Sequence, residues 1–541
     1  MPAIESRIDP SQPAFAERRV GMLELIAQLR ALEQRPVAAS ARAGPLFERR
    51  GQLLPRERLA RLLDPGAPWL ELSSLAGWLA DSPDPEKSVP GGGMISGIGW
   101  VGGTRCVVLV NDAGIDAGAI QHMGREKLLR AQEIALENKL PYVQLIESAG
   151  ANLLLYQVDG FVHGGRIFYN LARLSAAGIP VVAVVHGSST AGGAYMPGLS
   201  DYVIMVRGRA KAFLAGPPLL KAATGEIATD EELGGGEMHT SVSGLGEYLA
   251  EDDADGLRIA REVVARIGWD PPTAPVLPGA PAVEPLYPCD ELAGVMPLDV
   301  RTPIDMREVI ARIVDGSEFL DYGADYGPAT VCGHAAVYGQ PVGIVTNNGP
   351  IDPAGANKAT HFIQSCCQAG IPLLYLQNTT GYIVGKSSEQ AGMIKHGSKM
   401  IQAVSNANVP SITIHCNASF GAGNYGMCGR AFGPRFVFSW PNGRTAVMGG
   451  EQAALTMRIV AEAGARRKGQ PVDEAQLGAL EQRIIANFDR QSSAFYTSGR
   501  MLDDGVIDPR DTRRVLGLVL DVCKQAERRV LRPVQFGVAR P

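Results

Sequence analysis

The chain has 541 residues, 45% of them hydrophobic and 20% charged, which is typical of a folded protein long enough for two domains. Its formal net charge of −5 gives no general attraction to nucleic acid or to an anionic membrane. The eight cysteines include no C-x-x-C pair, and no apolar stretch is long enough to span a bilayer, so we expect a cytoplasmic protein.

The N-terminal segment predicts a helical arm, because Leu23, Ile26, Leu29 and Leu32 recur at helical spacing. Further along, Trp269–Pro288 is rich in proline and alanine and has no periodic pattern, which indicates a linker. The predicted division is an arm at residues 1–60, a first domain at 61–270, a linker at 271–288 and a second domain at 289–541.

One pattern occurs twice, about 230 residues apart. Lys139–Gly150 and Ala369–Gly381 each consist of a helix end, a proline, an apolar run and a glycine turn. About thirty residues later, Gly178–Tyr195 corresponds in the same way to Asn408–Tyr425. The sequence therefore predicts two duplicated α/β domains, each built on parallel strands.

Each second segment of the repeat ends in a loop of small residues, Ser189–Tyr195 and Phe420–Tyr425. Such a turn leaves backbone N–H groups unpaired, and these groups can stabilise an enolate oxygen that glycine lets approach closely. A single glycine turn after a strand is more often only structural. Two matching copies favour a pair of oxyanion holes, which suit a reaction with two developing negative oxygens.

Other catalytic patterns are missing from the sequence. There is no G-x-S-x-G elbow, Walker loop or H-E-x-x-H pattern, and we predict no metal site. The histidines are isolated, and each is more readily explained by packing or exposure than by acid–base chemistry.

Several further segments resemble one family, the carboxyltransferase β subunits of biotin-dependent acyl-CoA carboxylases. The resemblance covers nearly the whole chain from about residue 15. It implies two tandem crotonase-like (ClpP/crotonase) domains, each a β-β-α superhelix. The segments that carry it, beside the two loops, are Gly51–Arg58, Leu62–Gly66, Arg130–Ala135, Phe213–Pro218, Lys221–Glu226, Asp230–Gly235, Pro341–Val345 and Gly370–Gly381.

The resemblance also implies a mechanism. Carboxybiotin delivered by a partner subunit loses CO2, and the resulting biotin enolate removes a proton from an acyl-CoA, so no strong side-chain base is needed. One oxyanion hole holds the biotin ureido oxygen and the other holds the thioester enolate. Carried over by position, the amides of Ala191, Gly192 and Gly193 would serve the acyl-CoA, and those of Gly421, Ala422 and Gly423 would serve the biotin.

Partners follow from the same resemblance. The biotinylation signature and an ATP-grasp glycine loop are both missing, so biotin and its carboxylation would reside on a biotin carboxylase and biotin carrier α subunit. The family implies a β hexamer in an α6β6 complex, with sites formed between domains of different protomers. The predicted substrate-binding residues are Gly164, Gly165, Tyr195, Phe420 and Tyr425.

Within the family, the motifs are most similar to enzymes that carboxylate the γ carbon of a branched 2-enoyl-CoA. Gly164 stands where 3-methylcrotonyl-CoA carboxylases typically have phenylalanine, and a lost ring leaves room for a longer isoprenoid tail. We therefore favour geranyl-CoA over 3-methylcrotonyl-CoA. Alternatively, Gly164 meets a backbone requirement, or Phe161 or Tyr169 fills the space. Glu147, where those enzymes usually have aspartate, is expected to be structural.

Three other functions remain open at this stage. The chain could be a stand-alone crotonase-type enoyl-CoA hydratase or isomerase, although such an enzyme needs carboxylate bases and only one half of this chain. It could also be a decarboxylase subunit of a membrane pump, or a non-catalytic scaffold for an α subunit.

Overall fold

A computed structural model describes residues 2–150, 158–269, 282–467, 471 and 473–534. Most of the predicted linker at 271–288 lies outside these residues. The chain divides into two compact units. The N unit comprises Arg30–Pro275, Gly499–Met501 and Lys524–Pro541, and the C unit comprises Met1–Leu29, Val276–Ser498 and Leu502–Cys523. The four domain boundaries given above stay a prediction.

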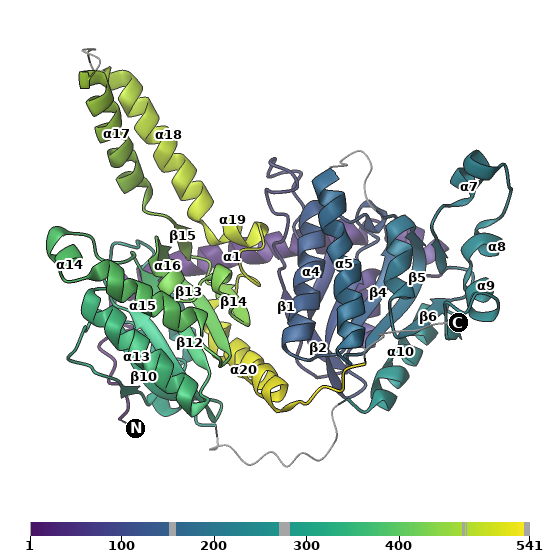
Figure 1. Ribbon diagram of the computed structural model, residues 1–541, viewed down its shortest axis with the longest axis horizontal. Helices are drawn as coiled ribbons and strands as arrows, with labels where there is room; N and C mark the ends of the chain where they lie inside the picture. The colour runs from purple at the N-terminus through teal and green to yellow at the C-terminus, as the bar shows by residue number, and fades with distance from the viewer. Residues whose placement is uncertain (1, 151–157, 270–281, 468–470, 472, 535–541) are drawn as a thin grey trace. The chain divides into compact units, whose positions relative to one another are not determined.

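The N unit is built on one mixed sheet (Figure 1). Its strands lie in the order β1-β2-β3-β4-β5-β6-β8, with β7 beside the end of β5. The strands are β1 (Leu70–Leu72), β2 (Met94–Val101), β3 (Thr104–Asn111), β4 (Tyr142–Ser148), β5 (Val181–Thr190), β6 (Tyr202–Val206), β7 (Lys211–Phe213) and β8 (Tyr248–Ala250). The helices are α2 (Gly44–Arg49), α3 (Pro55–Leu62), α4 (His122–Glu137), α5 (Val158–Ala176), α6 (Tyr195–Gly198), α7 (Pro217–Thr224), α8 (Asp230–Gly234), α9 (Gly236–Ser241) and α10 (Asp253–Ile267).

The C unit repeats this plan, with strand order β14-β13-β12-β11-β10-β9 and β15 beside the end of β13. The strands are β9 (Leu320–Asp321), β10 (Thr330–Val337), β11 (Gln340–Asn347), β12 (Leu373–Thr379), β13 (Ser411–Phe420), β14 (Phe436–Ser439) and β15 (Arg444–Ala446). The helices are α11 (Leu292–Val295), α12 (Arg307–Ile310), α13 (Pro353–Ala369), α14 (Lys386–Gln390), α15 (Met393–Ser405), α16 (Gly423–Gly426), α17 (Gly450–Arg467), α18 (Glu474–Ser492), α19 (Ala494–Gly499) and α20 (Thr512–Arg528). Helix α1 (Pro13–Ala41) begins in the C unit and ends in the N unit.

Strand pairing confirms the predicted duplication. In each unit two eight-residue strands form an antiparallel hairpin, β2 with β3 and β10 with β11. The next strands then add in parallel, β4 and β5 in one unit and β12 and β13 in the other. All seven residues of β4 and all ten of β13 are buried, as expected for parallel strands covered on both faces.

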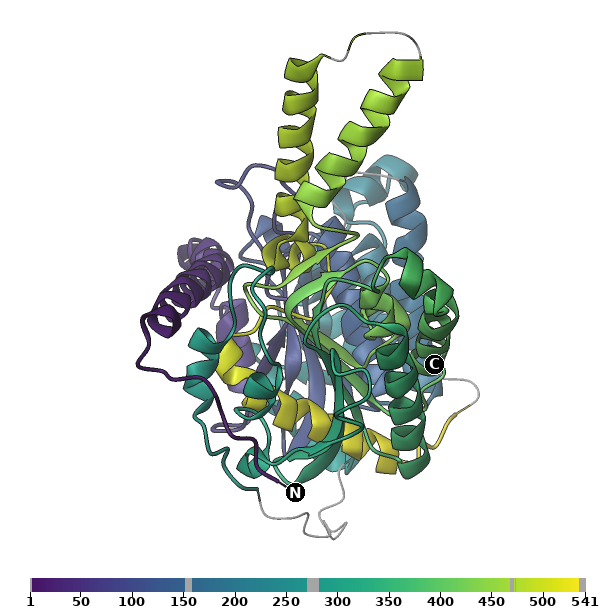
Figure 2. The same ribbon diagram turned by 90° about the vertical axis from the view of Figure 1, so that its left-hand side faces the viewer.

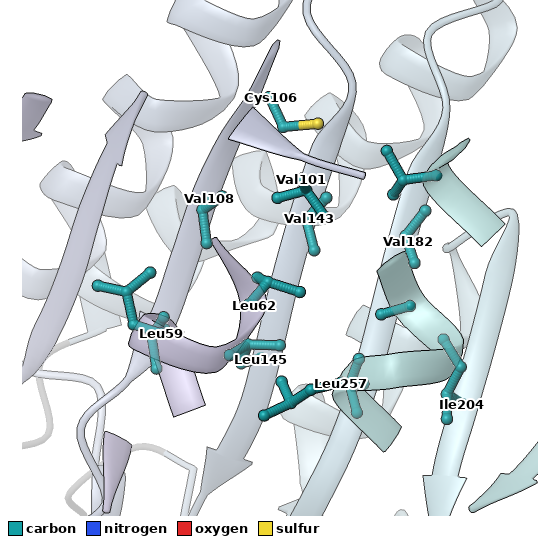
Figure 3. Packing of buried hydrophobic residues seen from close by; sticks show 14 of the residues in the cluster. Leu59, Leu62, Val101, Cys106, Val108, Val143, Leu145, Val182, Ile204 and Leu257 are labelled. Atoms are coloured by element: carbon teal, nitrogen blue, oxygen red, sulfur yellow. The ribbon is translucent and has the colours of Figure 1, made fainter. Parts of the chain in front are cut away.

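The hydrophobic core of the N unit lies between its sheet and two helices (Figure 3). Leu59 and Leu62 of α3 and Leu257 of α10 pack against Val108 of β3 and Val182 of β5. Because α3 and α10 are far apart in sequence, this packing ties the start of the unit to its end.

A helical hairpin projects from the C unit. Helices α17 and α18 pack against each other and extend away from the sheet of their unit (Figures 1 and 2). Four large apolar side chains of α17 are exposed, Leu455, Met457, Ile459 and Val460. Among the described residues, none of the helices has the length and apolarity that a bilayer crossing requires.

The core packing predicts that substitutions of two leucines in the N unit will differ in their effect on stability. Leu62 is completely buried, so Leu62→Ala should lower the free energy of unfolding by about 2–5 kcal/mol. Leu136→Ala, at a side chain that is 42% exposed, should change it by less than about 0.5 kcal/mol. The measurement is urea unfolding followed by the fluorescence of tryptophan, since four of the five tryptophans lie in this unit. Equal effects of both substitutions would contradict the packing.

Candidate active site at two matched loops

The first loop follows β5 and begins with an unusual backbone conformation. Ala191 has φ +53°, a left-handed conformation that a residue with a Cβ rarely adopts. Side chains on either side hold the turn, because Ser189 Oγ donates to Gly193 O at 2.9 Å and Thr190 Oγ1 donates to Ala149 O at 3.2 Å. The chain thereby turns sharply out of the sheet, as the sequence predicted for this loop.

The second loop makes the same turn after β13. Gly421 occupies the position of Ala191 and has φ +56°. Ser419 is hydrogen-bonded here as well, since its Oγ donates to Gln377 Oε1 and accepts from Asn424 Nδ2 at 2.7 Å. The two loops therefore share their backbone conformation, although only one of them has glycine at the left-handed position.

The backbone N–H groups of the two loops differ in whether they already donate a hydrogen bond within the protein. Gly421 N–H donates to Ala446 O at 2.9 Å, so that amide is already used within the fold. The prediction for the second loop is therefore narrowed from three amides to those of Ala422 and Gly423. Gly192 and Ala422 occupy matching, exposed positions, whereas Gly193 and Gly423 are buried. Within the described residues, the N–H groups of Gly192 and Ala422 donate to no other group.

The helices that follow the loops are short. Helix α6 (Tyr195–Gly198) and helix α16 (Gly423–Gly426) each have four residues, about one turn. Aligned peptide dipoles add up along a helix, so one turn contributes little field. The loops thus offer directed N–H groups rather than a helix dipole.

Neighbouring strands bring a second glycine turn against each loop. Gly150 follows β4 with φ +84°, and a Cβ there would lie 3.4 Å from Thr190 O. Gly381 follows β12 with φ +112°, and a Cβ there would lie 3.3 Å from Phe420 O. Both turns are closed by a side-chain oxygen two residues earlier, Ser148 in one and Thr379 in the other. The site geometry is therefore duplicated over two strand ends in each unit.

Helix α5 covers the first loop with an aromatic side chain. A Cβ at Gly192 would lie 3.6 Å from the Phe168 ring, and this ring makes an edge contact with Tyr195 at 5.9 Å between centroids. Gly164 lies one helical turn before Phe168 and so on the same face of α5. Gly165 is its exposed neighbour, and a Cβ there would meet nothing within 4 Å.

The surroundings of Gly164 bear on the two alternatives left open above. Gly164 lies inside α5 and is absent from the residues with positive φ, so its backbone conformation does not require glycine. Among the described residues, a Cβ at this position would meet only Arg125 Cδ, at 3.9 Å. Neither Phe161 nor Tyr169 approaches it within 4 Å, and both are exposed. Within the part of the chain that the structure describes, no side chain other than that of Arg125 lies against a Cβ at this position.

The other three predicted substrate-binding residues differ in how exposed their side chains are. Tyr195 and Tyr425 are each about half exposed at the ends of their loops, and Tyr425 packs against Phe432 with ring centroids 5.6 Å apart. Phe420, in contrast, is buried as the last residue of β13. A ligand can therefore reach Tyr195 and Tyr425, whereas the Phe420 side chain is buried, and a substrate-binding role for all three stays a prediction.

Sequence reasoning missed a buried charged cluster in the N unit, formed by Arg58, Glu147, His186 and Asp253. Arg58 Nη1 donates to Glu147 at 2.6 Å, and Arg58 Nε donates to Asp253 at 2.9 Å. Asp253 also bonds His186 Nδ1 at 2.8 Å. The four side chains are only 1%, 8%, 0% and 3% exposed, in the order named. They come from α3, β4, β5 and α10, so no local spacing could reveal the cluster.

Two members of this cluster, His186 and Asp253, have pKa values below their ordinary ones. Burial and the nearby Arg58 charge lower the pKa of His186, so this ring is neutral near pH 7 and donates from Nδ1 to the carboxylate. Burial alone would raise the pKa of Asp253, but the hydrogen bond from His186, the Arg58 charge and the Leu53 N–H bring it down to about 2. Asp253 is thus ionised in the folded protein.

Comparisons with known proteins give a consistent result. Residues 48–535 match the family described as carboxyl transferase domain. The chain is 47% identical over 523 residues to the probable biotin-dependent acyl-coenzyme A carboxylase beta2 subunit of Mycobacterium tuberculosis, covering 96% of each chain. It is 47% identical over 540 residues to the 3-methylcrotonyl-coenzyme A carboxylase beta1 subunit of that organism, covering 98% of each. The crystal structure of the P. aeruginosa geranyl-CoA carboxylase beta subunit superimposes with TM-score 0.93 and 55% identity over all of both chains.

The lowered pKa of Asp253 predicts a pH-dependent contribution to stability. An ordinary aspartate has a pKa of about 3.9, so the contribution is complete above about pH 5 and is lost as the pH falls through 4 toward 2. Asp253→Asn should remove on the order of 2 kcal/mol or more at pH 7. Urea unfolding of both proteins should show this difference shrinking below about pH 4. A difference that stays constant down to the lowest pH at which the wild type folds would contradict the assignment.

Proposed function

This chain belongs to the carboxyl transferase family, among the β subunits of biotin-dependent acyl-CoA carboxylases, and we propose that it carboxylates the γ carbon of a branched 2-enoyl-CoA. The observation that carries the proposal is the pair of matched loops with exposed amides at Gly192 and Ala422, which donate to no group among the residues that the structure describes. Carboxybiotin on a partner subunit supplies the activated CO2.

The first loop is proposed to hold the acyl-CoA. Gly192 N–H donates to the thioester oxygen, and it does so more strongly as negative charge develops on that oxygen when the γ proton leaves. Conjugation places the charge of the dienolate on this same oxygen. In the mechanism that the resemblance implies, the γ proton would pass to biotin after biotin has lost CO2, and the γ carbon would then bond to that CO2, so the chain needs no strong side-chain base beside the loop. Ala422 N–H would correspondingly donate to the biotin ureido oxygen.

We favour geranyl-CoA as the acceptor. Gly164 lies on the face of α5 that also carries Phe168 against the first loop, and among the described residues only Arg125 approaches a Cβ there, which supports the passage of a long acyl tail along this face. The 55% identity to the geranyl-CoA carboxylase beta subunit supports this choice. 3-Methylcrotonyl-CoA is the alternative, supported by the 47% identity to the beta1 subunit named above.

The proposed partners are a biotin carboxylase and biotin carrier α subunit and further copies of this chain. Exposed apolar side chains on α17 and at Val158, Phe161 and Val162 of α5 support self-association, since a monomer rarely leaves such residues grouped on its surface. We propose a β hexamer within an α6β6 complex. None of the eight cysteines, all of which lie in described residues, forms a disulfide bond, which fits the reducing cytoplasm.

The test of the function is a reconstitution. The chain, its biotinylated partner subunit, ATP and bicarbonate should fix labelled bicarbonate into geranyl-CoA faster than into 3-methylcrotonyl-CoA. Hydration of either enoyl-CoA by the chain alone, without carboxylation in the complex, would instead identify a crotonase-type hydratase.

Substitution at Gly192 should separate catalysis from folding. A Cβ at this position makes only an ordinary contact with Phe168, so Gly192→Ala should fold and keep most of its activity. The γ methyl groups of Gly192→Val would stand before the amide and should lower kcat for carboxylation about 100-fold or more. Both are measured by bicarbonate fixation, with circular dichroism to check folding. Full activity in Gly192→Val would exclude an oxyanion role for this loop and would favour a scaffold.

Substitution at Gly164 tests the acceptor. Gly164→Phe should lower kcat/KM for geranyl-CoA at least 10-fold while 3-methylcrotonyl-CoA is still carboxylated. Gly164→Ala is the matched control, because its Cβ would meet only Arg125 and should leave geranyl-CoA turnover intact. Unchanged geranyl-CoA turnover in Gly164→Phe would refute the pocket argument.

A further inference from the structure

The buried charged cluster touches the strand that carries the first loop, at a bulge. Pairing of β4 with β5 runs from Ile146 opposite Val185 to Ser148 opposite Ser189. Between these pairs β4 has one residue, Glu147, and β5 has three, residues 186–188. The bulge thus lies directly before Ser189, where the first loop begins.

Glu147 lies against the backbone of this bulge. A Cβ at Gly187 would be 2.6 Å from the carboxyl group of Glu147, so glycine is required for the carboxylate to fit there. Gln52 Nε2 donates to His186 O at 2.9 Å and to Glu147 at 3.3 Å. The bulge is therefore held through a carbonyl, a side chain and direct packing.

The second unit provides an internal comparison. Strands β12 and β13 have the same bulge, with Asn378 in the place of Glu147. The surrounding hydrogen bonds are made by neutral amides, Asn378 Nδ2 to Asn347 O at 3.2 Å and Asn442 Nδ2 to Cys416 O at 3.0 Å. The buried carboxylate of Asp503 is one side chain removed, because it accepts from Ser439 Oγ, which bonds His415 Nδ1 at 3.2 Å. A bulge of this geometry therefore forms without an ion pair directly against its backbone. Since removing ions from water is costly, a buried ion pair directly against the bulge of the N unit calls for a separate role.

We infer that Glu147 is a positioning residue for the first loop. It holds the bulge in place, and the bulge in turn directs the Gly192 amide at the thioester oxygen. This inference rests on the proposed carboxyl transfer. The mechanical link is short, because Ser148 pairs with Ser189, and Ser189 Oγ in turn bonds Gly193 O at 2.9 Å. An amide displaced by about 1 Å loses much of its stabilisation of a developing negative oxygen.

The C unit contains a matched control. Glu308 and Arg312 form an ion pair at 2.9 Å with side chains 8% and 1% exposed, the same as those of Glu147 and Arg58. Glu308 also accepts from Ser6 Oγ and Arg7 N–H, so it is as fully bonded as Glu147. Glu308 lies in α12 and Arg312 just after it, so neither residue belongs to the strands that lead into the two loops, and we expect loss of this pair to act on stability rather than on kcat.

The experiment measures steady-state carboxylation in the complex with the biotinylated partner subunit, at a temperature where circular dichroism shows every variant folded. Glu147→Gln should lower kcat 10- to 100-fold and change KM for the acyl-CoA less than 3-fold, because binding contacts remain while the amide is misaimed. Glu308→Gln should lower the thermal midpoint by about as much as Glu147→Gln does, and it should leave kcat within 2-fold of the wild-type value. Glu147→Asp keeps the negative charge beside Arg58, but its shorter side chain withdraws from Gly187, so it should also lower kcat. This variant replaces Glu147→Gln in the test if Glu147→Gln does not fold.

The possible results separate two failures. Equal kcat values for the folded Glu147 variants and the wild type, or an equal loss in Glu308→Gln, overturn the positioning role. No carboxylation by the wild-type complex of either acyl-CoA overturns the proposed function instead.

Discussion

The proposed chemistry depends on one backbone constraint, the left-handed residue that follows a buried parallel strand. At Ala191 and at Gly421 this conformation turns the chain out of the sheet before the next amide can join it. Gly192 and Ala422 are consequently exposed with N–H groups that no protein group accepts within the described residues. Rigid strands on both sides hold these donors in place, so little reorganisation is needed when charge develops.

Duplication has preserved this constraint while its support has diverged. Both units share the strand order, the bulge and the close approach of a neighbouring glycine turn. The bulge is backed by ionised side chains around Glu147 in the N unit and by amides around Asn378 in the C unit. If the loops serve different oxygens, as proposed, each can be tuned separately by residues that never touch a ligand.

Much of the fold was predictable, since apolar runs after Pro141 and Pro372 mark the strands and glycines mark their ends. The left-handed conformation at Ala191 was not, because alanine gives no local signal for it. Pairing of the Gly421 amide depends on Ala446, a strand contact that the loop sequence does not encode. The buried charged cluster could not be predicted from the sequence either, because only tertiary packing brings its members together.

The way the chain is shared between its units has a consequence for biosynthesis. The C unit combines Met1–Leu29 with Val276–Ser498 and Leu502–Cys523, whereas the main part of the N unit, Arg30–Pro275, is continuous. Phe15 is buried so closely against Gly294 that a Cβ there would lie 2.5 Å from its ring. Because a chain is synthesised from its N-terminus, all strands of the N sheet are made before Gly294, so the residues that cover Phe15 are added only after that sheet can form.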